Sequence, residues 1–301
     1  MERVKIFLVP VVLATLLAWW GCAELQDDLQ APVAPGVAAH PAGWTDKVSS
    51  VFHGNAIRTA NWDMRPCQTC HGVTYTGGTS GSSCRDCHRE SGGPESCATC
   101  HGGVNPAPPR DLSNNTATSA RGVGAHQRHV LGSSTAPQVR CGECHVVPGP
   151  IYAPGHIDAT PGAEVVFNNP LSRTVTNEPS TVDYDASLPL VTPAPSYNAS
   201  TLSCASTYCH GNFKNGNTGF APVWNDLSGA QAACGTCHGD VTKATLAERA
   251  LPLTVANGGT HPDSTACYQC HPDVVDANVR IINAVKHVDG RLDIDGSARD
   301  F

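Results

Sequence analysis

The sequence predicts an irregular, loop-rich fold with short helices and a few short strands, in which side chains supply little of the core. Two features of the composition predict it. The 301 residues include 29 glycines and 23 prolines, which favour turns over long helices and strands. Aromatic residues make up only 6% of the chain and charged residues 15%, so large packing groups are scarce. The 15 cysteines are a third feature and indicate what else fills the core.

Fourteen of these cysteines lie in seven motifs that each end in histidine. Six motifs read Cys-x-x-Cys-His, the attachment signal for c-type haem, in which two thiols bond to the haem vinyl groups and the adjacent histidine becomes the proximal iron ligand. The seventh motif, Cys204–His210, has a longer spacer of four residues, which must bulge away from the haem edge. The predicted thioether residues are Cys67, Cys70, Cys84, Cys87, Cys97, Cys100, Cys141, Cys144, Cys204, Cys209, Cys234, Cys237, Cys267 and Cys270, and the proximal histidines are His71, His88, His101, His145, His210, His238 and His271.

Other cysteine-rich classes fit this pattern less well. A disulfide scaffold would not need a histidine after every second cysteine. A zinc ribbon needs two cysteine pairs per metal, and seven is an odd number. We therefore predict seven covalently attached c-type haems, and packed haems would supply the missing apolar volume of the core.

The remaining histidines match the number of haems. Of the 14 histidines seven follow motif cysteines, and the other seven are candidate distal iron ligands: His40, His53, His126, His129, His156, His261 and His287. A single histidine is more often a surface residue, but the equal numbers favour ligation. Methionine is nearly excluded as a ligand, because only Met1 and Met64 exist and Met1 leaves with the signal.

Two expectations concern which irons these histidines serve. His126 and His129 are three residues apart, so they share a helix face and reach two different haems. The stretch Cys67–His101 holds no histidine beyond its three proximal ones, so its distal ligands are expected from His40, His53, His126 or His129.

The N-terminus has the layout of an export signal. Arg3 and Lys5 flank the start of an apolar run from Ile6 to Trp20, and the run is shorter than the roughly 20 residues of a membrane-spanning helix. An uncleaved anchor is the weaker reading. The residues up to Cys22 resemble a lipobox, in which Cys22 is acylated, although Trp19 stands where leucine is usual. Ordinary signal-peptidase cleavage is the alternative.

The predicted organisation has five parts. They are a signal peptide (1–21), a lipid-anchored tether (22–43), a four-haem domain (44–154), a hairpin and linker (155–200) and a three-haem domain (201–301). Strands are expected at 163–167 and 173–176, and one or two more in the tail 279–294, turning at Asp289-Gly290. Short helices are expected at the motifs.

The composition and motifs also exclude several classes of function. The net charge of −7 and the lack of a basic run argue against nucleic-acid binding. An acidic surface suits cationic redox partners. There is no phosphate-binding glycine loop, nucleophile elbow or paired-carboxylate constellation.

The segment from about Leu202 to Ile294 resembles the CxxxxCH/CxxCH multihaem c-type cytochromes of metal-reducing bacteria. The matching pieces are Cys204–Asn212, Cys234–Gly239, Cys267–Pro272 and His287–Gly290. The resemblance implies bis-histidine haems in a loop-rich fold and electron transfer across or outside the outer membrane, as in an outer-membrane lipoprotein cytochrome.

We therefore expect a heptahaem electron carrier rather than an enzyme, although it could reduce extracellular metal oxides as a terminal step. Its expected partners are periplasmic or outer-membrane cytochromes and a porin-type conduit. Its expected location is the cell-surface or periplasmic face of the outer membrane. The alternatives are a multihaem reductase of a small nitrogen or sulfur oxyanion, and a structural subunit of an electron conduit or filament.

Overall fold

The computed structural model describes residues 39–103, 105–108, 110–158, 162–177 and 189–300. The expected signal peptide, the acylation site Cys22 and most of the tether lie outside these residues. The chain divides into two compact units after Asp86, and we call the described residues up to Asp86 unit 1 and those from Cys87 unit 2. This division falls inside the second motif. It therefore differs from the expected boundary between a four-haem and a three-haem domain at 155–200.

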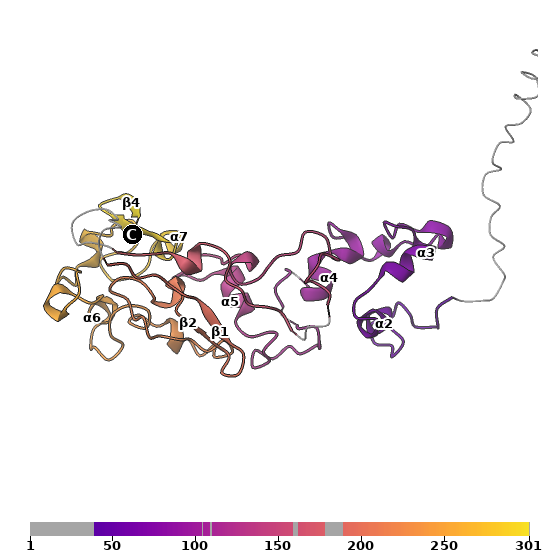
Figure 1. Cartoon of the computed structure of the whole chain (residues 1–301), viewed down its shortest axis with the longest axis horizontal. Helices are drawn as coiled ribbons and strands as arrows, with labels where there is room; N and C mark the ends of the chain where they lie inside the picture. The colour runs from indigo at the N-terminus through magenta and orange to yellow at the C-terminus, as the bar shows by residue number, and fades with distance from the viewer. Residues whose placement is uncertain (1–38, 104, 109, 159–161, 178–188, 301) are drawn as a thin grey trace, which may run out of the picture. The chain divides into compact units, whose positions relative to one another are not determined.

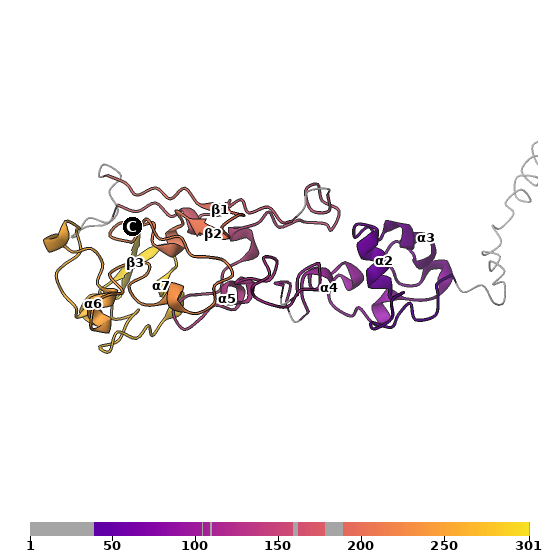
Figure 2. The ribbon, with the colours of Figure 1, turned by 90° about the horizontal axis from the view of Figure 1, so that it is seen from below.

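Unit 1 consists of short helical turns joined by loops (indigo to purple in Figures 1 and 2). Pro66 lies in the first turn of η1, where its missing N–H costs no hydrogen bond. Gly72 ends α3 with a φ of 78°, a conformation that favours glycine. The elements are α2 (His53–Thr59), η1 (Arg65–Cys67), α3 (Gln68–His71), η2 (Gly78–Ser80) and η3 (Cys84–Asp86).

Unit 2 has the same character, with two small antiparallel sheets added. In the first sheet β1 (Ser196–Asn198) pairs with β2 (Ser203–Ala205), and in the second β3 (Arg291–Ile294) pairs with β4 (Ser297–Asp300). The β3–β4 hairpin lies beside α7 in both views (Figures 1 and 2). The helical elements are η4 (Gly93–Glu95), α4 (Cys97–His101), α5 (His126–Leu131), η5 (Cys141–Glu143), η6 (Leu171–Arg173), η7 (Tyr208–His210), η8 (Ala230–Ala232), α6 (Leu246–Ala250), η9 (Val255–Asn257), η10 (Cys267–Gln269) and α7 (Ala284–His287).

Short helical turns do occur at six of the seven motifs, as expected. The hairpin predicted at 163–176 is wrong. Residues 163–167 form no strand, because their backbone serves the fourth motif: Val166 N–H donates to the carbonyl of Cys144 at 2.8 Å. The tail does contain a strand within 279–294, but its hairpin turns at Asp295-Gly296 rather than at Asp289-Gly290.

Long-range contacts within unit 2 connect segments on either side of 155–200. Trp224 donates from Nε1 to the carbonyl of Arg121 at 2.8 Å, and Asn225 donates to the carbonyl of Ser119 at 3.1 Å. His287 Nδ1 bonds to the carbonyl of Thr135. The C-terminal motifs are therefore tied to the segment before the fourth motif within one compact unit.

The polypeptide of the described residues has a sparse apolar core. Its buried hydrophobic side chains are Met64, Tyr75, Ala107, Val123, Ala125, Phe167, Tyr208 and Val275. In the same residues, no helix has the length and apolar character that crossing a membrane requires. The loop-rich fold predicted from glycine and proline content is confirmed.

Candidate haem sites

The histidines of the described residues meet in pairs, and each pair joins one motif histidine to one candidate distal histidine. Six such pairs are present, with ring centroids 5.9 to 6.4 Å apart. The pairs are His40 with His71 (6.0 Å), His101 with His156 (5.9 Å), His126 with His145 (6.3 Å), His129 with His210 (6.1 Å), His238 with His287 (6.3 Å) and His261 with His271 (6.4 Å).

This separation fits one metal ion between two imidazoles. A metal–imidazole bond is roughly 2 Å long and a ring nitrogen lies roughly 1 Å from the ring centre, so two imidazoles on opposite sides of one metal have centroids roughly 6 Å apart. All six measured separations agree with that value. No group of three or more histidine, cysteine or acidic side chains converges in the described ranges.

Hydrogen bonds prepare these imidazoles for metal ligation. Ten of the paired or candidate histidines have Nδ1 bonded to a backbone carbonyl. Since a carbonyl only accepts, Nδ1 carries the proton and Nε2 keeps the lone pair that a metal needs. His145, for example, bonds to the carbonyl of Glu164 at 2.6 Å, and His271 to that of Asp293 at 2.6 Å.

The pairing differs from one sequence expectation. His40 lies beside His71, as one of the four histidines expected to serve Cys67–His101. His101, however, lies beside His156, which was not among those four. His156 lies in the loop after the fourth motif, where its Nδ1 donates a 2.6 Å hydrogen bond to the carbonyl of Ile151. This contact orients the His156 ring beside His101.

His126 and His129 lie on α5 and contact two different motif histidines, His145 and His210. The helix therefore spans two sites, in line with the spacing. One further candidate distal histidine, His53, belongs to unit 1, and one further motif histidine, His88, belongs to unit 2.

The described cysteines are all free thiols, so no disulfide competes with haem attachment among them. Burial raises the pKa of Cys209 to about 12 and that of Cys144 to about 12. The second cause for Cys144 is the thiol of Cys204, whose own pKa burial raises to about 11. The fourth and fifth motifs therefore lie next to each other.

Comparison with known protein families gives one match. A family model described as the Geobacter CxxxxCH...CXXCH motif matches residues 203–238. This segment carries a multihaem c-type cytochrome motif. It indicates covalently attached haem c and electron transfer. No curated protein and no solved structure matches the chain.

The four-residue spacer of this cytochrome motif is folded inward. Cys204 lies in β2, and Ser206 then takes a φ of 55°. The following residues, Thr207 and Tyr208, are buried, and the ring of Tyr208 lies 5.6 Å from that of Phe213. The extra length is therefore used to place an aromatic side chain in the core.

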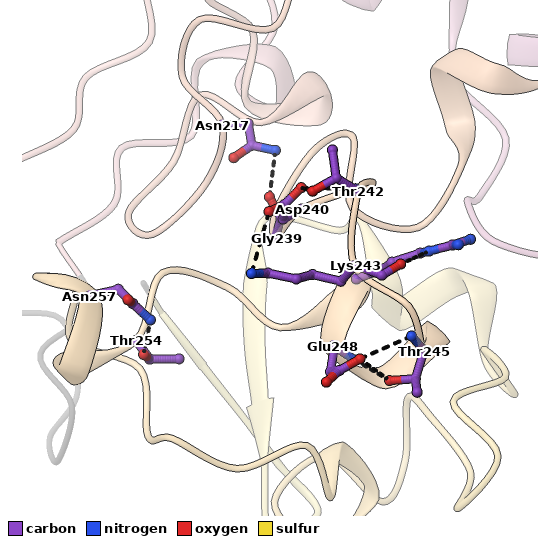
Figure 3. Close-up of polar contacts among 10 residues, drawn as sticks. Asn217, Gly239, Asp240, Thr242, Lys243, Thr245, Glu248, Thr254 and Asn257 are labelled. Carbon is purple, nitrogen blue, oxygen red and sulfur yellow. Dashed lines mark hydrogen bonds and ion pairs between the residues drawn. The ribbon is translucent and has the colours of Figure 1, made fainter.

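Asn217, which lies between the two halves of the motif, holds the second half. Its side-chain amide donates to the carbonyls of Gly235, Thr236 and Gly239 at 3.0, 2.9 and 3.2 Å, and Figure 3 shows the contact with Gly239. These carbonyls belong to or adjoin the second cysteine motif, so one side chain fixes the loop that carries His238.

Helix α6 (Leu246–Ala250) provides the hydrogen-bond acceptor for the His238 side chain. Thr245 and Glu248 form a capping box at its N-terminus, in which Thr245 Oγ1 accepts from the Glu248 N–H at 3.3 Å (Figure 3). The last residue of the helix, Ala250, accepts a 2.8 Å hydrogen bond from His238 Nδ1. The capping box therefore supports a ligand-orienting carbonyl.

Three imidazoles of unit 2, those of His126, His210 and His238, are neutral in the folded chain at pH 7. Burial lowers the pKa of His126, His210 and His238 to about 4. Neighbouring imidazoles add to the effect: His145 lowers the pKa of His101, and His129 lowers that of His126.

Further contacts show which sites are neighbours. His261 and His271 act on the pKa of His238, and Phe213 links Tyr208 of the fifth motif to His238 with centroids 6.2 Å apart. The pair of His238 therefore adjoins the pair of His271, and Phe213 connects it to the fifth motif.

Proposed function

We propose that the protein is a heptahaem c-type cytochrome that carries electrons through closely spaced bis-histidine haems. The six histidine pairs, each with the centroid separation expected across a single metal, carry this proposal. Each bound haem supplies a one-electron couple between ferric and ferrous iron. The seventh haem follows from the sequence, which holds seven motifs and seven candidate distal histidines.

The side chains have separate roles in this proposal. The two cysteines of each motif bond covalently to the haem, and the following histidine binds the iron. The distal histidine would supply a second imidazole to the same iron, which would leave no ligand position for a substrate. Carbonyls bonded to Nδ1 fix the tautomer and the orientation of most of these rings.

A haem-packed core fits the sparse polypeptide core. Only eight hydrophobic residues are buried in the described chain, while Val73, Val146 and Leu131 are 79%, 68% and 60% exposed. Haem faces would bury such side chains and stabilise a chain that has little regular structure.

We further propose that the protein acts at the outer membrane in extracellular electron transfer. The export signal, the cysteine at position 22 and the match at 203–238 support this role. In this setting, acylated Cys22 anchors the chain, and periplasmic or outer-membrane cytochromes, a porin-type conduit or metal oxides exchange electrons with it.

The mass of the mature protein tests the cofactor count. We expect the polypeptide from Cys22 plus seven haems and a lipid. A mass with fewer haems would contradict the heptahaem proposal, and an unmodified Cys22 would contradict the anchor without affecting the haems.

Carbon monoxide binding tests the main alternative, a multihaem reductase. A reductase needs at least one iron with an open axial position, whereas bis-histidine sites bind carbon monoxide poorly. We expect the reduced native protein to show no substantial binding. Stoichiometric binding at one haem would favour the enzyme.

A further inference from the structure

The histidine pairs fall into two classes by the angle between their ring planes. Four pairs are near-parallel, with angles of 15°, 29°, 29° and 18°. Two are near-perpendicular: His129 with His210 at 78° and His238 with His287 at 74°. Both perpendicular pairs contain a motif histidine of the matched segment 203–238.

One aromatic ring adjoins the first perpendicular pair. Trp224 lies 5.5 Å from His129 with an interplanar angle of 25°, which is an offset stack. The same ring lies edge-on to His126, with centroids 4.7 Å apart and an angle of 87°. Trp224 therefore contacts the candidate distal ligands of two neighbouring sites.

The position of Trp224 is itself well determined. Its Nε1 donates to the carbonyl of Arg121 at 2.8 Å, and its backbone N–H donates to that of Leu202 at 2.6 Å. Gly124 allows the close approach, since a Cβ there would lie 1.9 Å from Trp224 Nε1. Two backbone segments and a glycine thus hold the indole in one orientation.

We propose that Trp224 is a positioning residue that sets the ring plane of His129 and keeps it perpendicular to that of His210. The proposal rests on the proposed function, in which both histidines bind one haem iron. The 3.0 Å bond from Nδ1 of His129 to the carbonyl of Ala125 fixes one edge of the imidazole. Stacking on the indole restricts rotation about that contact.

The angle between two axial imidazoles has a direct spectroscopic signature. Parallel rings interact with the same iron d orbital, and perpendicular rings with two different ones. Low-spin ferric haems of the two classes therefore give different electron paramagnetic resonance spectra, and perpendicular sites give the more anisotropic signal. This readout does not depend on electron-transfer activity.

The test compares spectra of the fully oxidised, haem-loaded wild-type protein and its variants. We expect Trp224→Leu to lose one haem's share of the anisotropic signal, and Trp224→Phe to keep it because phenylalanine also stacks. The His238–His287 pair serves as an internal control, since its signal should persist. Trp62→Leu, a substitution in unit 1, is the matched control and should leave the spectrum unchanged.

Gly124→Ala provides a second route, because the added methyl group displaces the indole without removing it. It should lose the same share of the anisotropic signal as Trp224→Leu. If the mass of the leucine variant shows that a haem is missing, Gly124→Ala is the variant that tests the proposal. An anisotropic signal of wild-type intensity in both variants would overturn the proposal. A wild-type protein with high-spin or carbon monoxide-binding haem would instead contradict the proposed function.

Discussion

A tryptophan stacks on a candidate distal histidine in each unit, yet the two sites differ. In unit 1 Trp44 stacks on His40 at 4.5 Å and 3°, and His40 is near-parallel to His71 at 15°. In unit 2 Trp224 stacks on His129 at 5.5 Å and 25°, but His129 stands at 78° to its partner His210. A stacked indole therefore does not by itself decide the angle between the two imidazoles.

The two sites also differ on the motif side. In unit 1 the short Cys67–His71 motif leaves His71 Nδ1 bonded to the carbonyl of Ser82 at 2.8 Å. In unit 2 the longer spacer turns at Ser206 and buries Tyr208 before His210. The tryptophan contacts the distal imidazole, whereas the motif positions the proximal imidazole. The orientations of the two rings can therefore vary independently.

Removing a distal ligand should have the largest effect. His40→Ala and His129→Ala should each open one iron, giving one carbon monoxide-binding haem per reduced protein. Titration with carbon monoxide, followed by absorption, measures the stoichiometry. Asn215→Ala, which removes no candidate ligand, is the control, and wild-type binding in either histidine variant would refute that pair.

Truncating a buried tyrosine should have the next largest effect. Tyr75 in unit 1 and Tyr208 in unit 2 are only 3% and 4% exposed. Replacing either with alanine should lower the free energy of unfolding by about 3–5 kcal/mol, as for other large buried aromatics. Denaturant unfolding followed by circular dichroism measures it.

The matched controls are Tyr75→Phe and Tyr208→Phe, which keep the ring; Tyr208→Phe should cost only about 1 kcal/mol for its hydrogen bond to the backbone of Gly290. If Tyr75→Ala changes the spectrum of the unit 1 site and Tyr208→Ala that of the unit 2 site, the two units respond separately. Equal disturbance of both sites by either variant would break the comparison between the units.

The reduction potentials of the His40–His71 site in unit 1 and the His129–His210 site in unit 2 should differ as well. A ferric centre carries one more positive charge than a ferrous one, and burial disfavours the more charged form. Cys67 and Cys70 are exposed, whereas Cys204 and Cys209 are partly buried. We expect the unit 2 site to have the higher potential by about 60 mV or more, a tenfold change in its equilibrium constant.

Spectroelectrochemical titration measures these potentials, and methionine substitution assigns them. Since a methionine ligand raises the potential, His40→Met and His129→Met should each shift one component upward. The prediction fails if, in the wild-type protein, the component assigned by His129→Met has a lower potential than the component assigned by His40→Met.

The smallest effect should come from the helix cap that supports the second perpendicular site. Thr245→Ala removes the capping box of α6 and should cost about 1 kcal/mol. Thr242→Ala, on the same loop, removes only a turn contact with Asp240 and is the matched control. Thermal unfolding measures the difference, and equal losses in both variants would argue against support of His238 through the cap.

The sequence alone predicted the candidate attachment sites, because each motif places two thiols and a histidine within five to seven consecutive residues. It also determined the loop-rich fold class, since glycine and proline act locally on the backbone. It gave a complete set of candidate distal histidines, because residue counts need no coordinates.

Only the tertiary structure decided which histidines meet. His101 lies beside His156, and His129 beside His210, through contacts between segments that are distant in the chain. Residues 163–167 have strand-like composition, yet the fourth motif uses the carbonyl of Glu164 and the N–H of Val166. Local propensity cannot anticipate such long-range hydrogen bonds. The angle between two imidazoles likewise depends on the packing of Trp224, which no local pattern around His129 encodes.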